Sequence, residues 1–400
     1  MIKYKFPYFT IAILFFSMLP VTMIVPVFKD IIKDRLGGDN LMVSYFMSVA
    51  MLGSFLFSPI AGYLSDKFKT RKWFIGIFAI LDGISFILLS ITTDLEVLQL
   101  VRFFEGICHI FVIGLLLALL ADRENDESNE KFFRKGIVLG IGGMFLSLGV
   151  GLGSPLGVLG KKNPLVPFYV ASAIMIAIGI LTMFFLKDYE YYHEKKVTLG
   201  NWIQALKEKP LVLVPSMFNF IDRFTVGFFV TSFNLHFREE LQLSAGMVGV
   251  LLSLVLLPMS LFSYPFAILA RKTGPFPLML IGSLIYGICM GIAGYIQITT
   301  FLIPVLLFCG IGAGVMFVPS MMMVIRLSPK NLNASVISGF TGFGSIGFML
   351  GPICSVLLQN YLKEQFVGWN SFGLTACIFG GLEVLIVLFT LPLYKKMQES

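Results

Sequence analysis

Apolar runs long enough to cross a lipid bilayer recur along the whole chain. A helix needs about 20 apolar residues to cross the hydrocarbon core, whereas the strands of a membrane β-barrel alternate over about ten residues. The runs here are continuous and of the longer kind. They predict spans at 6–28, 42–64, 73–92, 97–121, 136–160, 166–187, 211–234, 245–269, 278–297, 302–327, 333–358 and 371–393.

The composition points to lipid as the solvent for these segments. Of the 400 residues, 57% are hydrophobic and 13% are charged, and the mean hydropathy is +0.88. A soluble protein of this size has too little interior to bury so much apolar surface. We therefore expect an all-α membrane protein with twelve transmembrane helices and no sizeable soluble domain.

The basic residues predict the orientation in the membrane. Most of the 30 Lys and Arg residues lie in every second loop, as the positive-inside rule requires when both termini are cytosolic. The net charge of +7 then reflects topology and gives no reason to expect nucleic-acid binding. We expect a multi-pass protein of the cytoplasmic (inner) membrane with both termini in the cytosol.

A polar stretch divides the spans into two groups of six. We predict three parts: an N-terminal six-helix bundle at 1–187, a cytosolic linker at 188–210 and a C-terminal six-helix bundle at 211–400. Within the linker, residues 199–206 are expected to form a short helix on the cytosolic surface.

The two groups resemble each other in their details. Basic residues follow Leu64 after the second span and Leu269 after the eighth, and glycine-rich runs end at Pro155 and Pro352. Such spacing indicates a duplicated, pseudo-symmetric chain, and parallel repeats around a central site are a known plan of transporters. One copy of such a chain suffices, so we expect a monomer.

The loop after the second span carries a recognisable motif. It reads Gly62-Tyr-Leu64-Ser-Asp66-Lys67-Phe-Lys69-Thr70-Arg71-Lys72. This segment resembles the signature that the major facilitator superfamily carries between its second and third helices. Lys69 stands where the family has Gly, and Thr70 stands where it has Arg. Further agreements are Pro26, Arg102 with Gly106, and Asp122 followed by Arg134.

The resemblance implies the major facilitator fold and a conformational latch. In the family, the loop aspartate lies at the cytosolic seam near the start of the eleventh helix, where a carboxylate is stabilised by the helix dipole. The implied latch residues are Gly62, Asp66, Lys67, Arg71, Asp122 and Arg134. The alternative is that these charges only enforce orientation.

Charged residues inside the spans are candidates for function, because each costs about 2.5–3.5 kcal/mol at mid-bilayer. In the fourth span, Arg102, Glu105 and His109 share one helical face. The seventh span holds Asn219, Asp222 and Arg223 near its centre. The resemblance implies that both spans line a central cavity, so we expect these six residues to bind protons and substrate.

The expected mechanism is electrostatic competition. Burial favours the neutral form of a carboxyl, whereas a nearby Arg favours the charged form, so a proton can exchange against a solute. The alternative is a static ion-pair network, with His109 hydrogen-bonded in the packing. Asp82 and Glu383 also lie mid-span, but on helices that are peripheral in the family. We expect them to pair with neighbouring helices or with a basic side chain rather than to couple transport.

The fifth span resembles the glycine- and proline-rich motif of antiporters at Gly149, Gly153, Pro155 and Gly157, with Ser154 in place of a Gly. Ordinary packing of small residues between helices is the alternative. Phe220, Phe224 and Phe228 form a stripe on the seventh span that slightly favours apolar substrates.

Other chemistry is not expected. The five cysteines lack metal-ligand spacing. The run Gly342-Phe-Gly344-Ser-Ile-Gly347 lies within an apolar span, without the strand that a dinucleotide site needs. We find no ATP-binding loop and no catalytic constellation, so we expect no enzyme, cofactor or metal.

The leading hypothesis is a secondary active transporter. It would export small amphipathic or drug-like molecules in antiport with protons, by alternating access. Its partners would be the small-molecule substrate, protons and the lipid bilayer. The alternatives are a uniporter or symporter of a small nutrient, or a lipid or lysolipid flippase on the same fold.

Overall fold

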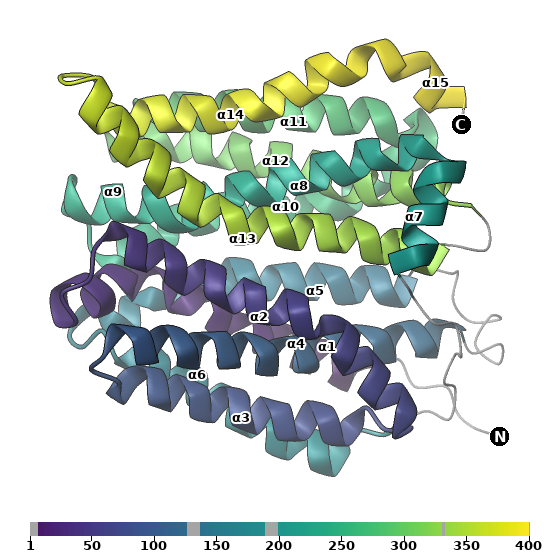
Figure 1. Ribbon diagram of the computed structural model, residues 1–400, viewed down its shortest axis with the longest axis horizontal. Coiled ribbons are helices and arrows are strands. Elements are labelled where there is room, and N and C mark those ends of the chain that lie inside the picture. The colour runs from purple at the N-terminus through teal and green to yellow at the C-terminus, as the bar shows by residue number, and fades with distance from the viewer. Residues whose placement is uncertain (1–6, 126–136, 189–198, 330–332, 400) are drawn as a thin grey trace. The chain divides into compact units, whose positions relative to one another are not determined.

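The computed structural model describes residues 7–125, 137–188, 199–329 and 333–399, and every regular element in these ranges is helical (Figure 1). Twelve of the described helices are long and apolar enough to cross a membrane. The predicted all-α membrane fold with twelve transmembrane helices is confirmed.

The chain contacts define two compact units. The N unit comprises Met1–Glu194 and Ser244–Val250, and the C unit comprises Lys195–Leu243 and Leu251–Ser400. Most internal packing lies within one unit or the other, so each unit has its own buried interior.

The N unit is built from six long helices and short 3-10 and π segments. In chain order these are α1 (Tyr8–Met23), η1 (Val25–Val27), η2 (Asp30–Arg35), α2 (Asn40–Lys67), α3 (Lys72–Ile91), α4 (Leu95–Asn125), α5 (Ile137–Gly153), η4 (Ser154–Lys161) and α6 (Val166–Phe185). Helix α1 packs on α5, α2 on α4, and α3 on both α4 and α6. The α2–α4 crossing is close because it uses glycine. A Cβ on Gly106 would overlap the backbone of Ala50, so these helices approach as small-residue membrane pairs do.

The C unit has the same kind of architecture. Its elements are α7 (Leu199–Glu208), η5 (Pro210–Val212), α8 (Leu213–Phe228), η6 (Phe229–Phe233), α9 (Asn234–Glu239), α10 (Ala245–Thr273) from Leu251 onward, α11 (Pro275–Ala293), α12 (Thr299–Leu327), α13 (Asn333–Gln365), α14 (Ser371–Thr390), η7 (Leu391–Leu393) and α15 (Tyr394–Glu399). Helix α8 packs on α13, and α11 packs on α12 and α14. The predicted seventh span comprises η5, α8, η6 and α9, with π geometry over Phe229–Phe233.

Large apolar side chains also lie on the outside of the helices. Leu100, Phe184 and Phe389 are mostly exposed. A water-soluble surface rarely carries so many exposed apolar groups, but hydrocarbon solvates them without penalty. The exposed faces therefore agree with a lipid environment.

The short helix predicted at 199–206 is confirmed as α7. The ring centroids of Trp202 on α7 and Phe343 on α13 are 5.4 Å apart. This contact packs α7 against another helix of the C unit. Residues 189–198 of the predicted linker lie outside the described residues.

The aromatic stripe of the seventh span is part of the C unit's packing. Phe224 stacks on Phe379 of α14 with ring centroids 4.9 Å apart, and Phe228 stacks on Phe372 at 5.4 Å. Phe228 is 1% exposed. Since these two rings pack against another helix of the same unit, the stripe gives little support for apolar substrates.

Candidate functional site: buried polar clusters in each unit

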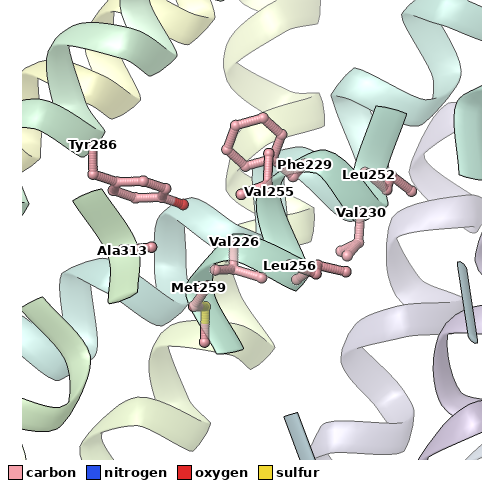
Figure 2. Close-up of a pocket in the computed structure, with 9 residues that line it drawn as sticks. All are labelled: Val226, Phe229, Val230, Leu252, Val255, Leu256, Met259, Tyr286 and Ala313. Atoms are coloured by element: carbon pink, nitrogen blue, oxygen red, sulfur yellow. The ribbon is translucent and has the colours of Figure 1, made fainter. Parts of the chain in front are cut away.

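The C unit contains a small apolar cavity (Figure 2). Its volume is about 20 Å³, and its lining includes Val226, Leu252, Met259 and Tyr286. That space is enough for about one water molecule, whereas small-molecule sites usually occupy about 300–1,000 Å³. The cavity is therefore too small for a solute, although Tyr286 in its lining also belongs to the polar group around Thr225.

Among the described residues of the N unit, the shortest ion pair joins Arg102 and Glu105 within α4. The Arg102 Nη1 atom lies 2.6 Å from Glu105 Oε2, and these side chains are 2% and 4% exposed. The Arg102 Nε–H donates to the carbonyl oxygen of Phe46 at 3.2 Å. The guanidinium carbon lies 4.8 Å from the centroid of the Phe46 ring, a favourable cation–π distance. The Arg102 charge is thus compensated on several sides.

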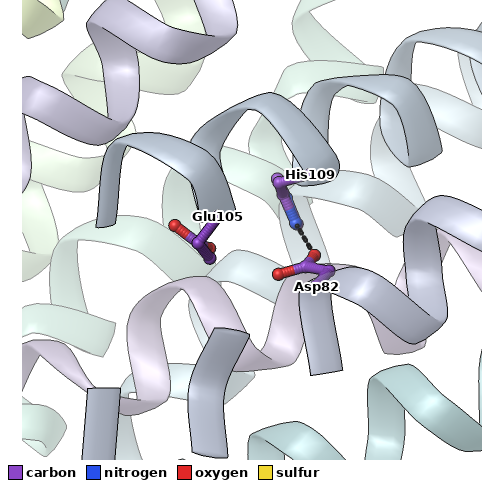
Figure 3. A group of neighbouring side chains, drawn as sticks. All are labelled: Asp82, Glu105 and His109. Atoms are coloured by element: carbon purple, nitrogen blue, oxygen red, sulfur yellow. Dashed lines mark hydrogen bonds and ion pairs between the residues drawn. The ribbon is translucent and has the colours of Figure 1, made fainter. Parts of the chain in front are cut away.

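A second acid joins this cluster from α3. The Asp82 Oδ2 atom lies 3.0 Å from His109 Nδ1 (Figure 3), and Asp82 is fully buried. The expectation that Asp82 pairs with a neighbouring helix is confirmed. Ligand atoms of Asp82, Glu105 and His109 all lie within 4.8 Å of one another. Glu105 and His109, which the sequence placed on one face of α4 with Arg102, thus lie close to the carboxyl of Asp82. Sequence reasoning had left Asp82 outside the site.

With both carboxyls ionised, the charges of this cluster differ by one proton from neutrality. Two ionised carboxylates and one guanidinium leave a single negative charge, which a proton on His109 cancels. Histidine is the side chain whose ordinary titration falls nearest neutral pH. The arrangement can therefore bind and release a proton without leaving Arg102 unpaired.

The same residues include metal-ligand types. Imidazole and carboxylate groups suit first-row transition metals. Asp82 Oδ1 and His109 Nε2 have no hydrogen-bond partner among the described residues. However, Glu105 already binds the Arg102 guanidinium, so a cation entering here competes with a resident positive charge.

The three polar residues predicted for the seventh span do not converge. The Asn219 Nδ2–H donates to the carbonyl oxygen of Phe340 on α13 at 2.7 Å. The Arg223 guanidinium lies over the Phe317 ring of α12, 4.5 Å from its centroid. Asp222 is 1% exposed, so it faces the interior of the C unit. Asn219 therefore contributes to helix packing, and Arg223 and Asp222 remain as an adjacent charge pair.

The ion pair between Asp222 and Arg223 has a long contact distance, and it leaves Asp222 without a hydrogen bond among the described residues. The Asp222 Oδ2 atom lies 3.5 Å from Arg223 Nε, and the Arg223 side chain is 25% exposed. Neither carboxyl oxygen of Asp222 has a hydrogen-bond partner among the described residues. A buried carboxylate without hydrogen bonds is costly, so an ionised Asp222 is poorly stabilised by the described side chains.

Glu383 of α14 lies close to Asp222 and is fully buried. Its Oε2 atom accepts a hydrogen bond from the Ser283 hydroxyl at 2.5 Å, and its Oε1 atom lies 3.2 Å from the Thr225 hydroxyl. The Thr225 oxygen also lies 3.3 Å from the hydroxyl of Tyr286. Sequence reasoning missed this arrangement because it places three helices, α8, α11 and α14, around one side chain. A glutamate in the middle of an apolar span was the signal available.

The loop motif forms a compact turn in the N unit. The Arg71 Nη2 atom lies 3.5 Å from Asp66 Oδ1, and Lys67 Nζ lies 5.8 Å from the centroid of the Tyr63 ring. Lys69 has a φ of 50°, in the left-handed region that favours glycine. This explains why the family pattern has Gly where this chain has Lys69. Around Gly62 there is open space.

Asp188, which the sequence assigned to the linker, caps the start of α3. Its Oδ1 atom accepts from the backbone N–H groups of Arg71 and Lys72, both at 2.9 Å. Its Oδ2 atom accepts from the Thr70 hydroxyl at 2.6 Å. A carboxylate at a helix N-terminus satisfies free N–H groups and favours the dipole. The predicted latch residue Arg134 and the side chain of Asp122 lie outside the described residues.

The glycines of the fifth span bring α5 and η4 against α1. A Cβ on Gly149 would overlap the carbonyl oxygen of Phe15, and one on Gly157 would lie 2.7 Å from Pro26. The α-helix ends at Gly153 and continues as the 3-10 segment η4, with Pro155 in its first turn. Close packing and a change of helix type thus coincide at this motif.

Comparison with known proteins identifies the family. The sequence pattern of the Major Facilitator Superfamily matches residues 10–232 and residues 216–399. The chain is 24% identical to Multidrug resistance protein 1 of Bacillus subtilis (strain 168) over 243 residues, which is 60% of each protein. It is 23% identical to the class E tetracycline resistance protein of Escherichia coli over 373 residues, covering 90% of this chain and 89% of the relative.

Solved structures agree on the fold. The nucleoside transporter NupG superposes with a TM-score of 0.77 at 14% identity, covering 98% of this chain and 100% of the other. A D-xylose-proton symporter superposes with a TM-score of 0.72 at 15% identity, covering 96% and 95%. Because the family pattern matches nearly the whole chain, the chain belongs to the major facilitator superfamily, and it is a multi-pass integral membrane transporter rather than an enzyme.

Proposed function

We propose that this protein exports small amphipathic or drug-like molecules in exchange for protons, by alternating access. The observation that carries the proposal is the buried cluster of Arg102, Glu105, His109 and Asp82, which lies one proton from neutrality. Relatives named for multidrug and tetracycline resistance support the substrate class. Antiport explains why such a costly cluster is kept inside an apolar helix pair.

Each member of the cluster has a proposed part. His109 takes up the proton, because Asp82 stabilises its charged form at 3.0 Å. Arg102 keeps Glu105 ionised in the proton-free state. A cationic or polar group of the solute then competes with the proton for the remaining negative charge. In the C unit, Asp222, Arg223 and the amide oxygen of Asn219, which has no hydrogen-bond partner among the described residues, would supply the polar contacts to the solute.

Further residues are proposed to act in the conformational cycle. The latch comprises Gly62, Asp66, Lys67, Arg71, Asp122 and Arg134. The ion pair of Asp66 and Arg71 would be remade as the state changes. In the helix-5 motif, Gly149, Gly153, Pro155 and Gly157 would keep α1 and α5 together during the movement.

The proposed setting follows from the distribution of positive charge. The protein would lie in the cytoplasmic membrane with both termini cytosolic and act as a monomer. Its two six-helix bundles, 1–187 and 211–400, would be joined by the linker 188–210.

Proton symport of a small nutrient is the second candidate. It is favoured by the fold likeness to a nucleoside transporter and to a D-xylose-proton symporter. Symport uses the same proton site with the solute moving in the direction of the proton.

Proteoliposomes with an imposed pH gradient separate the two candidates. With an acidic lumen, an antiporter accumulates tetracycline; with an acidic exterior, a symporter accumulates a nucleoside or D-xylose. Glu105→Gln should abolish the response to the gradient, and the matched control Glu96→Gln, an exposed acid on the same helix, should keep it. Solute flux that ignores the pH gradient in the wild-type protein would refute proton coupling.

A further inference from the structure

Glu383 is a buried acid without a parallel in the described part of the N unit. Its two carboxyl oxygens face the hydroxyls of Ser283 and Thr225, and the described part of the chain records no ion pair between it and a basic side chain. An ionised carboxylate in a dry interior needs a positive charge or several hydrogen-bond donors. A neutral carboxyl has one O–H, so it can donate to one of these two hydroxyls while it accepts a hydrogen bond from the other. The surroundings therefore fit the protonated form.

The charged and titratable groups around Glu383 come from several elements. Asp222 of α8 acts on it directly. Tyr286 of α11 lies beyond the Thr225 hydroxyl, and Cys309 of α12 approaches the Tyr286 carbonyl oxygen at 3.7 Å. Arg223 is the nearby cation, but it contacts Asp222 at 3.5 Å and the Phe317 ring. Among the described charged groups, Asp222 is the one that acts on Glu383, and its charge when ionised is negative.

Two buried carboxyls in electrostatic range do not both ionise readily, and among the described residues only Asp222 of the two contacts a cation. Asp222 has the Arg223 contact, so it is the member that carries the negative charge. Glu383 has only hydroxyl partners, so it is the member that carries the proton.

We propose that Glu383 is a proton-binding site of the C unit, separate from the Arg102 cluster, and that the negative charge of Asp222 keeps the proton in place. A solute cation that neutralises Asp222 then releases the proton from Glu383. The role of this site in transport rests on the proposed proton coupling, but its existence does not.

Infrared difference spectroscopy of the purified full-length protein tests the proposal without any solute. A protonated carboxyl has a carbonyl band that shifts in heavy water. We expect the wild type to show one such band that Glu383→Gln removes and that the control Glu96→Gln retains. Identical spectra for the wild type and Glu383→Gln would overturn the site.

The partners of Glu383 provide two further tests. Ser283→Ala should change the frequency of the band, because it removes the hydrogen bond at 2.5 Å. This variant carries the test if Glu383→Gln does not fold, and an unchanged frequency would then overturn the site. Asp222→Asn should weaken the band at a pH where the wild-type band is half its maximum. A band of equal amplitude in the wild type and in Asp222→Asn would show that Asp222 does not keep the proton on Glu383.

These outcomes are separable from those of the flux experiment. A band that behaves as expected in a protein whose flux ignores the pH gradient leaves the site standing and removes the proposed antiport. An unaffected spectrum in a protein with proton-driven flux removes the site and leaves antiport standing.

Discussion

The two units bury their acids in different ways. In the N unit, Glu105 faces a guanidinium at 2.6 Å and Asp82 faces an imidazole at 3.0 Å. In the C unit, Glu383 faces hydroxyls, and Asp222 has a cation only at 3.5 Å. The N unit compensates charge with charge, whereas the C unit surrounds an acid with neutral groups.

This difference predicts where a proton can be added or removed at low cost. Neutralising Glu105 leaves Arg102 buried without its counter-charge, which is expensive. Neutralising Glu383 leaves no cation behind, because its hydroxyl partners accept either form. The N cluster should therefore be sensitive to loss of an acid's charge, and the C cluster should tolerate it.

The largest expected effect comes from Glu105→Gln. Breaking a buried pair by removing one charge costs about 3–5 kcal/mol, so the free energy of unfolding should fall by an amount in that range. Denaturant unfolding in detergent measures it. The double variant Arg102→Met/Glu105→Leu should be more stable than Glu105→Gln, since it leaves no unpaired charge. A loss below about 1 kcal/mol for the single variant would break the comparison.

The next effect concerns the imidazole contact. Asp82→Asn should reduce stability by about 1.5–3 kcal/mol, the usual contribution of a hydrogen bond to a charged group. Because the ion pair exists only when His109 is protonated, the deficit should grow as the pH falls and shrink as it rises. Unfolding curves at several pH values measure this. A deficit that is independent of pH would show that His109 stays neutral.

The two arginine–aromatic contacts offer a matched pair of smaller effects. Phe46→Leu removes a ring from the buried Arg102, where a cation–π contact contributes about 2 kcal/mol. Phe317→Leu does the same for Arg223, which is 25% exposed, where about 0.5–1 kcal/mol is expected. The N-unit substitution should therefore be the more destabilising in the same unfolding assay. A larger loss of stability for Phe317→Leu than for Phe46→Leu would contradict the conclusion that Arg102 is the more completely buried charge.

The smallest expected effect is that of Glu383→Gln. Glutamine fills the same space and still exchanges hydrogen bonds with Ser283 and Thr225, so the loss of stability should stay below about 1 kcal/mol. Thermal unfolding beside Glu105→Gln gives the comparison directly. A loss as large as that of Glu105→Gln would mean that Glu383 is ionised and that the contrast between the units does not hold.

Several parts of the site were predictable from the order of residues alone. Arg102, Glu105 and His109 lie three and seven positions apart, and helical geometry then places them on one face. Asp82 could not be assigned to them, because its contact with His109 depends on how α3 is rotated against α4. Asn219 lies one turn from Arg223 on the same helix, so the sequence grouped the two residues. In the structure, however, the Asn219 amide donates a hydrogen bond to α13.

The loop after α2 shows a similar boundary. Its match to the family pattern was visible in the chain, including Lys69 at a position where the backbone turns left-handed. The cap that Asp188 provides to α3 was not visible, because 117 positions separate Asp188 from Arg71. The position of Asp188 after the end of a span does not indicate which helix its carboxylate contacts.

Local properties were therefore encoded directly: the twelve spans, the helical faces, the duplication and the family loop all depend on hydrophobic length and on spacing along one segment. Partnerships between helices required the folded molecule, as in the Asp82–His109 pair and the hydroxyl shell of Glu383. The physical reason is that an apolar helix in lipid is hydrophobic on every side, so its composition does not reveal which face turns inward. Small residues and side-chain shape decide how each helix is rotated about its axis. This rotation determines which partners the buried acids contact.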